Sequence, residues 1–496
     1  MRPGGIALAE IVRRLEADGR VVSAPGDSPV ITGVADDSRQ VREGDLFCAW
    51  AGTAMDGHRF VPAAETAGAV AALVERPVPE STLPQVVVRD GRRAAALAAA
   101  TFYGDPAASL HLVGVTGTNG KTTTTWLLRH LLGARWGAAS LGTLGVILDD
   151  GSPLPGGESL TTPGPVDLAR LLRELVDRGV GAVAMEVSSH ALDQGRVHAL
   201  RFDAAVFTNL TRDHLDYHGT EEAYLAAKRA LVGLLREDGA AVINADDAAW
   251  AGLEAASPRA LSYAIDRGDA EVRAERLELG PFGARFRLVA PGGAADVALP
   301  LLGRFNVYNA LGAAGAALAL GIEVEEVAAR LGSAPQVPGR LERVADVPCP
   351  VLRDYAHTPD ALERVLTALR PLVPGRLIVV FGAGGDRDRG KRPLMGAVVE
   401  RWADVPIVTS DNPRTEDPEL IIEEILAGMP AGRHLRVTDR RAAIARALEI
   451  ARPEDLVLLA GKGHETYQIV GQEKLPFDER EVVAELVAAR APEVGA

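Results

Sequence analysis

Lys121, Thr122 and Thr123 follow a glycine-rich segment at a spacing that suits phosphate binding. The segment is Gly117-Thr118-Asn119-Gly120; an apolar run at 110–115 precedes it, and leucines at helical spacing follow it. In such a turn the backbone N–H groups and the helix N-terminus face an anion, the lysine adds a point charge, and the first threonine can ligate magnesium. Val115 stands where the strict motif has its first glycine, so a plain tight turn is the alternative. The segment predicts a site for a nucleoside triphosphate.

Two further apolar runs end in polar clusters. One ends at Glu186, with Ser188 just beyond it, and the other, at 204–208, leads to Asn209 and His214. In doubly wound sheets the carboxyl ends of parallel strands form the edge where ligands bind. The acid at the end of the second strand of a P-loop site usually holds the magnesium that bridges the phosphates. We therefore expect Glu186 to serve Mg²⁺, with His214 at the same edge.

The last third of the chain shows the same pattern three times. The runs 377–381, 406–409 and 456–460 each deliver a charged loop, and these loops contain Arg387, Arg389, Arg414 and Glu465. The glycines at 382–385 lack the dinucleotide fingerprint, which argues against a nicotinamide cofactor. We expect the three arginines to converge near Glu465. Such a site suits a zwitterion that carries carboxylates and an amine.

Composition favours a large acidic α/β protein. The 496 residues are 47% hydrophobic and 4% aromatic, and the formal net charge is −14. This length predicts about three domains, and the negative charge argues against a nucleic acid partner. The two cysteines allow neither a disulfide framework nor a zinc site, which favours the cytoplasm. No apolar run is long enough to span a bilayer.

Two positions leave alternatives open at this stage. Ser38 and Arg39 could bind a phosphate or a sugar, but such a pair is more often a solvated turn. Lys228 lies on a helix expected at 221–235, and nothing in its sequence neighbourhood distinguishes it from a solvated surface lysine.

Taken together, these segments resemble the Mur ligase family, the ATP-dependent amide-forming ligases of peptidoglycan precursor synthesis. The resemblance spans about residues 38 to 480, and the segments that carry it are 117–123, 185–190, 208–214, Asn306 with Asn309, 338–342 and 354–359. It implies an N-terminal domain for the UDP end of the substrate at 1–105, a central P-loop ATPase at 106–337 and a Rossmann-like amino-acid domain at 338–496. The segment Asp411-Asn412-Pro413-Arg414 resembles the motif of the family member that adds meso-2,6-diaminopimelate to a UDP-linked muramoyl dipeptide.

The resemblance also implies roles for single residues. Those for the uridine end are Ser38, Thr53, Ala54 and Met55, and those for the muramoyl dipeptide are Thr161, Thr162, Ser188, Gln194 and Arg196. Magnesium would be held by Thr122, Glu186, His214 and Lys228, the last of which matches a lysine that the family carboxylates. ATP would meet the loop 117–123 with Asn309, Arg340 and Asp354, and diaminopimelate would meet Arg387, Asp411, Asn412, Pro413, Arg414, Gly461 and Glu465. Leu160 replaces an asparagine of relatives, which leaves room there for a backbone contact only.

The implied reaction begins when ATP converts the γ-carboxylate of D-glutamate to an acyl phosphate, which the incoming amine then attacks. Catalysis is expected to involve Lys121, Glu186, His214 and a carboxylated Lys228, in a monomer that closes around its substrates. The alternatives are a sister ligase for lysine, a folylpolyglutamate synthase-like ligase, a P-loop GTPase or regulatory switch, and a binding protein without catalysis. The chain has no Asn-Lys-x-Asp guanine motif, which argues against the GTPase.

Overall fold

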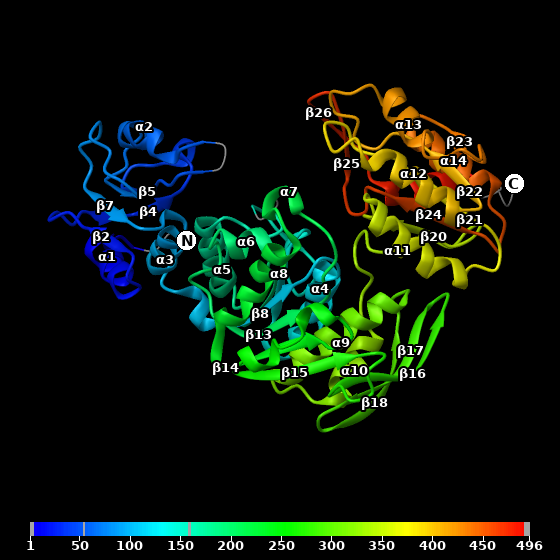
Figure 1. The fold of residues 1–496 in the computed structure, drawn as a ribbon, viewed down its shortest axis with the longest axis horizontal. Helices are drawn as coiled ribbons and strands as arrows, with labels where there is room; N and C mark the ends of the chain where they lie inside the picture. Colours follow the sequence, from blue (N-terminus) through cyan, green and yellow to red (C-terminus); the bar gives the residue numbers. More distant parts are fainter. Residues whose placement is uncertain (1–3, 53–54, 157–159, 491–496) are drawn as a thin grey trace, which may run out of the picture. The chain divides into compact units, whose positions relative to one another are not determined.

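The computed structural model describes residues 4–52, 55–156 and 160–490 of the chain. The chain folds into two compact units (Figure 1). The first contains Met1–Glu275, Arg287–Asp296 and Tyr308–Leu331, and the second contains Arg276–Phe286, Val297–Val307 and Gly332–Ala496. Among the described residues, no helix combines the length and the apolar character that crossing a membrane requires.

The N-terminal part of the first unit is a five-stranded sheet covered by helices. The strand order is β2 (Val21–Ser23), β7 (Gln85–Val88), β6 (Ala71–Val74), β5 (Asp45–Cys48) and β4 (Gly33–Ala35). The strands β4 to β7 are parallel, and β2 is antiparallel to β7. The amphipathic helix expected near the N-terminus is α1 (Leu8–Ala17), which buries Leu8, Ile11 and Leu15. Helix α3 (Gly91–Phe102) is alanine-rich and almost wholly buried, because small side chains let it pack closely.

The larger sheet of this unit carries the phosphate-binding segment. Its eleven strands run β11 (Pro153–Leu154), β10 (Gly145–Ile147), β9 (Ala138–Gly142), β12 (Ala182–Glu186), β8 (His111–Thr116), β13 (Phe202–Phe207), β14 (Leu235–Asn244), β15 (Arg259–Ala264), β16 (Val272–Gly280), β17 (Gly283–Ala290) and β18 (Gly293–Leu299). From β9 to β16 all neighbours are parallel. The central strands are continuous apolar runs, as expected where helices cover both faces. The predicted α/β class with a mostly parallel central sheet is confirmed.

The helices that connect the strands of this sheet lie close to their predicted positions in the sequence. The phosphate segment leads into α4 (Lys121–Trp136), and α5 (Pro165–Asp177) precedes β12. One prediction is wrong in extent: the helix expected at 221–235 ends as α8 (Glu221–Arg229), and a 3₁₀ segment (Ala230–Leu234) follows. The alanine-rich helix after the antiparallel strands is α9 (Arg304–Ala319), and α10 (Val324–Gly332) follows it.

The second unit contains a six-stranded sheet. Its order is β19 (Glu342–Ala345), β20 (Val351–Asp354), β24 (Leu456–Ala460), β21 (Leu377–Phe381), β22 (Val405–Val408) and β23 (Leu435–Arg436). All except β19 are parallel. The helices are α11 (Pro359–Leu369), α12 (Lys391–Trp402), α13 (Pro418–Leu426), α14 (Arg440–Ile450) and α15 (Glu479–Ala488), and a hairpin of β25 (Tyr467–Val470) and β26 (Glu473–Pro476) follows β24. Asp354, Phe381, Val408 and Ala460 end neighbouring strands, so the loops beyond them share one edge.

Candidate functional site

The glycine-rich segment between β8 and α4 forms a tight turn, as the predicted phosphate-binding loop requires. Gly117 has φ +142° and Gly120 has φ +89°, values that favour glycine. A Cβ at Gly117 would lie 1.9 Å from the Thr208 hydroxyl oxygen, so a larger residue could not fit there. The Lys121 ammonium donates to the carbonyl oxygens of Gly117 and Thr118, both at 2.9 Å. The lysine therefore bends back over the loop, at the place where a phosphate would sit.

Neighbouring elements hold this loop. The Asn209 side chain accepts from the Asn119 N–H at 3.1 Å, and the Thr118 N–H donates to the Asn209 carbonyl at 2.7 Å. A Cβ on Gly120 would lie 2.3 Å from Asn309 Oδ1, which places the predicted nucleotide residue Asn309 directly against the loop. Residues nearly two hundred positions apart thus meet at one strand edge.

Lys228 is buried, not solvated as its sequence neighbourhood suggests. Only 1% of the residue is exposed, and its ammonium donates to the Gly117 carbonyl at 2.8 Å. Burial, with the nearby charge of Lys121, lowers the pKa of Lys228 well below its ordinary value. The helical sequence around Lys228 carries no sign of this, because the loop that buries the lysine lies 111 residues earlier.

Glu186 ends β12 opposite Val115 of β8. The carboxylate is 1% exposed and accepts the Thr143 N–H at 2.8 Å. A Cβ at Gly142 would lie 2.2 Å from this carboxylate, so glycine is required beside it. Sequence reasoning missed Thr143, which no motif marks. Glu186 is thus a fixed, buried oxygen donor near the loop, as a magnesium ligand should be.

The residues expected to hold the muramoyl dipeptide lie together beside Glu186. The Thr162 hydroxyl donates to the Glu186 carbonyl at 2.8 Å and accepts from the Ser188 N–H at 3.1 Å. Arg196 donates to the Thr162 carbonyl at 2.8 Å and to the Gln194 side-chain oxygen at 2.7 Å. The Thr161 hydroxyl lies 3.3 Å from that of Thr143. Five residues predicted from three separate segments therefore lie in one hydrogen-bonded polar cluster: Thr161, Thr162, Ser188, Gln194 and Arg196.

His214 belongs to a cluster of aromatic rings next to this polar cluster. Its backbone is left-handed, with φ +53°, and its ring lies 4.8 Å from that of His190. Burial, followed by the charges of His214 and His218, lowers the pKa of His190 to about 4. In the part of the chain that the structure describes, no three His, Cys, Asp or Glu side chains form a metal-binding group.

Of the residues expected to bind the uridine end, Ser38 lies before β5 in the chain and Met55 lies after it. Ser38 begins a 3₁₀ turn capped by Asp37, and Arg39 pairs with Asp37 at 2.7 Å. Beside the turn is a cavity of about 760 Å³, lined by Asp36, Arg39, Gln40, Arg42, Asp45 and Tyr103, and by Asp167, Arg170 and Arg173 of α5. Met55 is 57% exposed. Thr53 and Ala54 lie outside the described residues.

In the second unit, Arg340 lies within the turn 339–341, and the Asp354 carboxylate is bonded to the end of this turn. Asp354 accepts the N–H groups of Leu341 and Ala356, at 2.7 and 2.8 Å. Burial raises the pKa of this carboxyl. The Arg340 guanidinium lies 4.8 Å from the centre of the Tyr355 ring.

The segment 411–414 meets the loop after β24. The Asn412 side chain donates to Glu465 at 2.8 Å and accepts from Lys462 at 3.1 Å, and Lys462 also lies 3.3 Å from Glu465. A Cβ at Gly461 would lie 2.6 Å from an Asp411 carboxylate oxygen. Lys462 is wholly buried, and sequence reasoning missed it.

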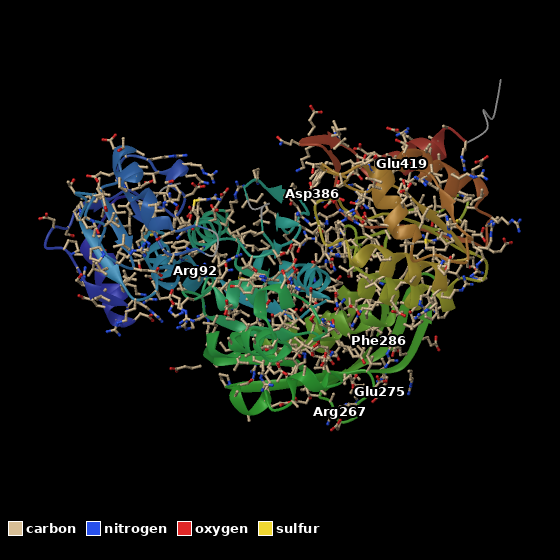
Figure 2. The ribbon with its side chains drawn as sticks, turned by 45° about the horizontal axis from the view of Figure 1, so that its top comes forward. Arg92, Arg267, Glu275, Phe286, Asp386 and Glu419 are labelled. Atoms are coloured by element: carbon tan, nitrogen blue, oxygen red, sulfur yellow. The ribbon has the colours of Figure 1, made fainter. Side chains whose placement is uncertain are left out.

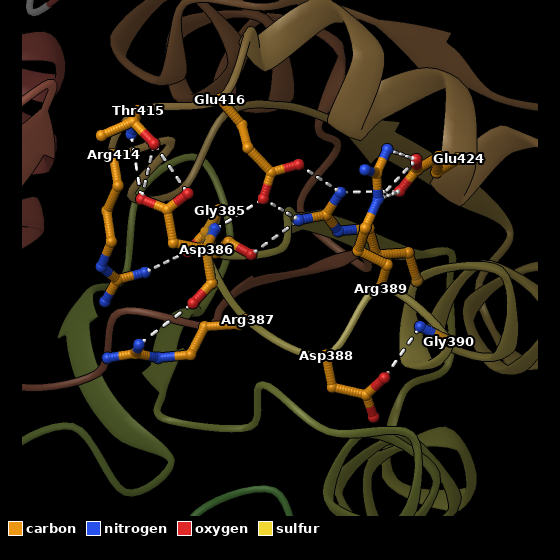
Figure 3. Close-up of polar contacts among 12 residues, drawn as sticks. Gly385, Asp386, Arg387, Asp388, Arg389, Gly390, Arg414, Thr415, Glu416 and Glu424 are labelled. Atoms are coloured by element: carbon orange, nitrogen blue, oxygen red, sulfur yellow. Dashed lines mark hydrogen bonds and ion pairs between the residues drawn. The ribbon is translucent and has the colours of Figure 1, made fainter.

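Two of the three arginines expected to converge contact successive carbonyl groups of one loop, and their approach to Glu465 stays a prediction. Arg414 donates to the Gly385 carbonyl at 2.8 Å, and Arg387 donates to the next carbonyl, that of Asp386, at 3.1 Å (Figure 3). The third prediction is wrong, because Arg389 turns away to pair with Glu424 on α13 (Figure 3). The two remaining guanidinium groups present donors that match a carboxylate.

Comparisons with known proteins agree with this geometry. Three family descriptions match the chain: "Mur ligase family, catalytic domain" at residues 30–103, "Mur ligase middle domain" at 115–317, and "Mur ligase, glutamate ligase domain" at 339–463. The chain is 49% identical over 476 residues to the UDP-N-acetylmuramoyl-L-alanyl-D-glutamate–2,6-diaminopimelate ligase of Synechococcus elongatus, covering 93% of this chain and 94% of that one. The enzyme of the same name from Geobacillus kaustophilus is 46% identical, with 94% and 96% covered.

Comparison with solved structures leads to the same family. A structure of a UDP-N-acetylmuramoyl-L-alanyl-D-glutamate–2,6-diaminopimelate ligase superposes with a TM-score of 0.72 at 35% identity, covering 98% of this chain and 99% of that one. A folylpolyglutamate synthase of Mycobacterium tuberculosis, complexed with ADP and AMPPCP, matches at 20% identity and a TM-score of 0.62, over 73% of this chain and 91% of that one. At that identity the second likeness concerns the fold alone.

Proposed function

The chain belongs to the Mur ligase family, and from that premise we propose that it is the ATP-dependent ligase that joins meso-2,6-diaminopimelate to UDP-N-acetylmuramoyl-L-alanyl-D-glutamate. The observation that carries the substrate is the identity of 45–49% with several ligases of that name, each over more than nine-tenths of both chains. The reaction forms an amide and releases ADP and phosphate. The reaction is a step in the synthesis of peptidoglycan precursors.

The first step uses the loop 117–123. ATP phosphorylates the γ-carboxylate of D-glutamate, and the Lys121 ammonium and the loop N–H groups stabilise the charge on the transferring phosphoryl group. Thr162, Gln194 and Arg196 would orient the dipeptide, because they lie together beside Glu186. Asn309 would bind the nucleotide, since it lies against Gly120. For Arg340 and Asp354 the nucleotide role stays a prediction.

Magnesium would be held by Thr122, Glu186 and His214, with a modified Lys228. The buried Glu186 carboxylate fits this cation, which prefers oxygen ligands and supplies electrostatic stabilisation to phosphoryl transfer. The Lys228 amine could not ligate a cation while protonated. Its lowered pKa favours the neutral amine, whose lone pair can attack CO₂ and, with loss of one proton to solvent, form a carbamate. The carbamate is an oxygen ligand.

The amino acid would bind at the loops after β21, β22 and β24. Arg387 and Arg414 would grip the distal carboxylate of diaminopimelate, and Asp411, Asn412, Pro413, Gly461 and Glu465 would hold its zwitterionic end. The α-amine then attacks the acyl phosphate, a tetrahedral intermediate forms, and phosphate leaves. Lysine lacks the second carboxylate and would leave both arginines unpaired, so discrimination should be large.

The proposal also covers the uridine end of the substrate, the domain boundaries, the cell compartment and the oligomeric state. The uridine end would lie near Ser38 and Met55. The cavity of about 760 Å³ lined by Arg39 and Gln40, which follow Ser38 in the chain, has room for a nucleotide. The division into domains 1–105, 106–337 and 338–496 is supported by the three matched segments. The free thiols of Cys48 and Cys349 favour the reducing cytoplasm. We propose a monomer, which light scattering on a sizing column would test.

The test is the mass of the product after incubation with ATP, the UDP-muramoyl dipeptide and either diaminopimelate or lysine. We expect one amide and one ADP per diaminopimelate, and little product with lysine. Equal product with lysine would favour the lysine-adding sister enzyme. ATP or GTP hydrolysis that needs neither the dipeptide nor an amino acid would favour a P-loop switch instead.

A further inference from the structure

Two loops of the second unit lie unusually close together. They are residues 382–390, after β21, and 409–416, after β22. A Cβ at Gly385 would lie 1.9 Å from the Pro413 carbonyl, and a Cβ at Gly384 would lie 2.9 Å from the Arg414 guanidinium. The glycines that resemble a dinucleotide fingerprint therefore serve a different purpose: they let the second loop rest directly against the first.

The contact places the two arginines side by side. The Gly385 N–H donates to the Asn412 carbonyl at 2.9 Å, while the Arg414 side chain returns to the Gly385 carbonyl. Arg387 is anchored on the adjacent carbonyl, that of Asp386. The spacing of the two guanidinium groups is thus set by the position of one short stretch of backbone, 385–386.

This stretch of backbone has an unfavourable conformation. Asp386 has φ +52°, and so does Arg414 on the facing loop. A non-glycine residue in this region is strained and persists only where its surroundings hold it. Side chains from the facing loop must therefore supply the restraint.

Glu416 supplies most of it. One carboxylate oxygen accepts the Asp386 N–H at 2.6 Å and an Arg392 N–H at 2.8 Å, and the other oxygen accepts from Arg392 at 2.9 Å (Figure 3). Arg392 is wholly buried and also donates to the Gly384 carbonyl at 3.2 Å. The bond from Arg392 lowers the pKa of Glu416 to about 2, so the carboxylate stays charged at neutral pH. Charge-assisted bidentate pairs of this kind are stronger and more directional than neutral hydrogen bonds.

A second, exposed link joins the same loops. The Thr415 hydroxyl donates to the Asp386 carboxylate at 2.8 Å, and the Thr415 N–H donates to it at 3.2 Å. Figure 2 shows Asp386 on this unit, together with Glu419 of α13. The Asp386 residue is therefore restrained through its backbone by Glu416 and through its side chain by Thr415.

We propose that Glu416 is a positioning residue for amino-acid selection, which holds the 384–386 backbone so that Arg387 and Arg414 together receive the second carboxylate of the amino acid. The inference rests on the proposed function. Glu416 itself would touch none of the three substrates: its effect would pass through Asp386, Arg392 and the two arginines. Thr415 supports the same placement through its exposed bonds to the Asp386 carboxylate.

The test compares two carboxylates that share Arg392. Glu424 accepts from Arg392 at 2.6 Å but has no contact with the 384–386 backbone among the described hydrogen bonds. Glu416→Ala should raise KM for diaminopimelate about tenfold or more and leave kcat within about twofold, because the lost hydrogen bonds are made by a charged group. KM for ATP and for the UDP-dipeptide should not change. Glu424→Ala, the matched control, should leave all KM values near those of the wild type.

Further variants separate positioning from folding. Glu416→Gln keeps an acceptor for the Asp386 N–H and should fall between Glu416→Ala and the wild type. Thr415→Val should raise KM for diaminopimelate about threefold, and Thr415→Ser should restore it. Equal effects of Glu416→Ala and Glu424→Ala, or parallel changes in every KM and kcat, would overturn the inference. A wild-type enzyme that forms no amide with diaminopimelate would instead refute the proposed function, a result that the same assay reports separately.

Discussion

The phosphate loop and the amino-acid loops perform comparable tasks by different means. The residues that would face phosphate, 117–123, are contiguous, and their donors are mostly backbone N–H groups. The residues that would face the amino acid come from three loops, at 385–387, 411–414 and 461–465, and side chains such as Glu416 and Lys462 hold those loops together. A contiguous site can be recognised from its spacing alone. An assembled site becomes visible only when the contacts between its parts are known.

The largest effect should come from the contiguous site. Lys121→Ala removes the point charge over the loop, and ligase activity should fall about a thousandfold, because a charge that acts on the transferring phosphoryl group has no substitute nearby. A coupled assay of ADP release measures this. The matched control is Lys474→Ala, a lysine of β26 that carries no proposed role. Near-normal activity of Lys121→Ala would contradict the proposal that this lysine stabilises the transferring phosphoryl group.

The next prediction concerns a residue that only the fold brings to the loop. Lys228→Ala should lower kcat at least about a hundredfold, since a lost magnesium ligand has no neighbour to replace it. Millimolar formate or acetate, which can enter the vacated space as a carboxylate, should restore part of the activity. A variant that retains full activity would show that the lysine is only a structural contact of Gly117.

Arg414→Ala tests the assembled site directly. KM for diaminopimelate should rise about a hundredfold, because truncating one partner of a hydrogen-bonded charge pair costs about 2–5 kcal/mol. KM for ATP should not change. Arg401→Ala, which removes an exposed ion pair with Glu363, is the control. If ATP affinity fell together with that for diaminopimelate, the two sites would not be separable as the comparison requires.

The smallest effect should appear in stability. Burial, and the charge of Asp167, raise the pKa of Asp36 to about 6. A carboxyl with a raised folded-state pKa destabilises the fold as the pH rises through that range and has no such cost below about pH 4. Asp36→Asn should therefore raise the free energy of unfolding by about 2 kcal/mol at pH 7.5, with little change at pH 4, as thermal unfolding can measure.

Its neighbour provides a control of opposite sign. The hydrogen bond from Arg39 lowers the pKa of Asp37, so that carboxylate contributes stability above its unfolded pKa, and the contribution is lost in acid. Asp37→Asn should slightly destabilise the protein at pH 7.5. Equal changes in the free energy of unfolding for Asp36→Asn and Asp37→Asn would contradict the electrostatic explanation.

Sequence alone determined where central strands lie and predicted the glycine-rich turn that follows β8. Apolar runs predicted β21 (Leu377–Phe381) and β24 (Leu456–Ala460) to the residue, because a buried parallel strand must be apolar on both faces. The resemblance then assigned residues such as Thr162 and Arg196, which the structure brings together.

Tertiary structure decided which charged side chains belong to a site. Lys228 and Lys462 are buried, while Arg389 turns away to Glu424. Neither outcome could be predicted from the spacing of these residues, because the environment of a charged side chain depends on which distant segment packs against it. Backbone geometry and apolar periodicity are local properties that a sequence encodes directly. The burial and pairing of a charge are set by contacts between segments that lie tens or hundreds of residues apart.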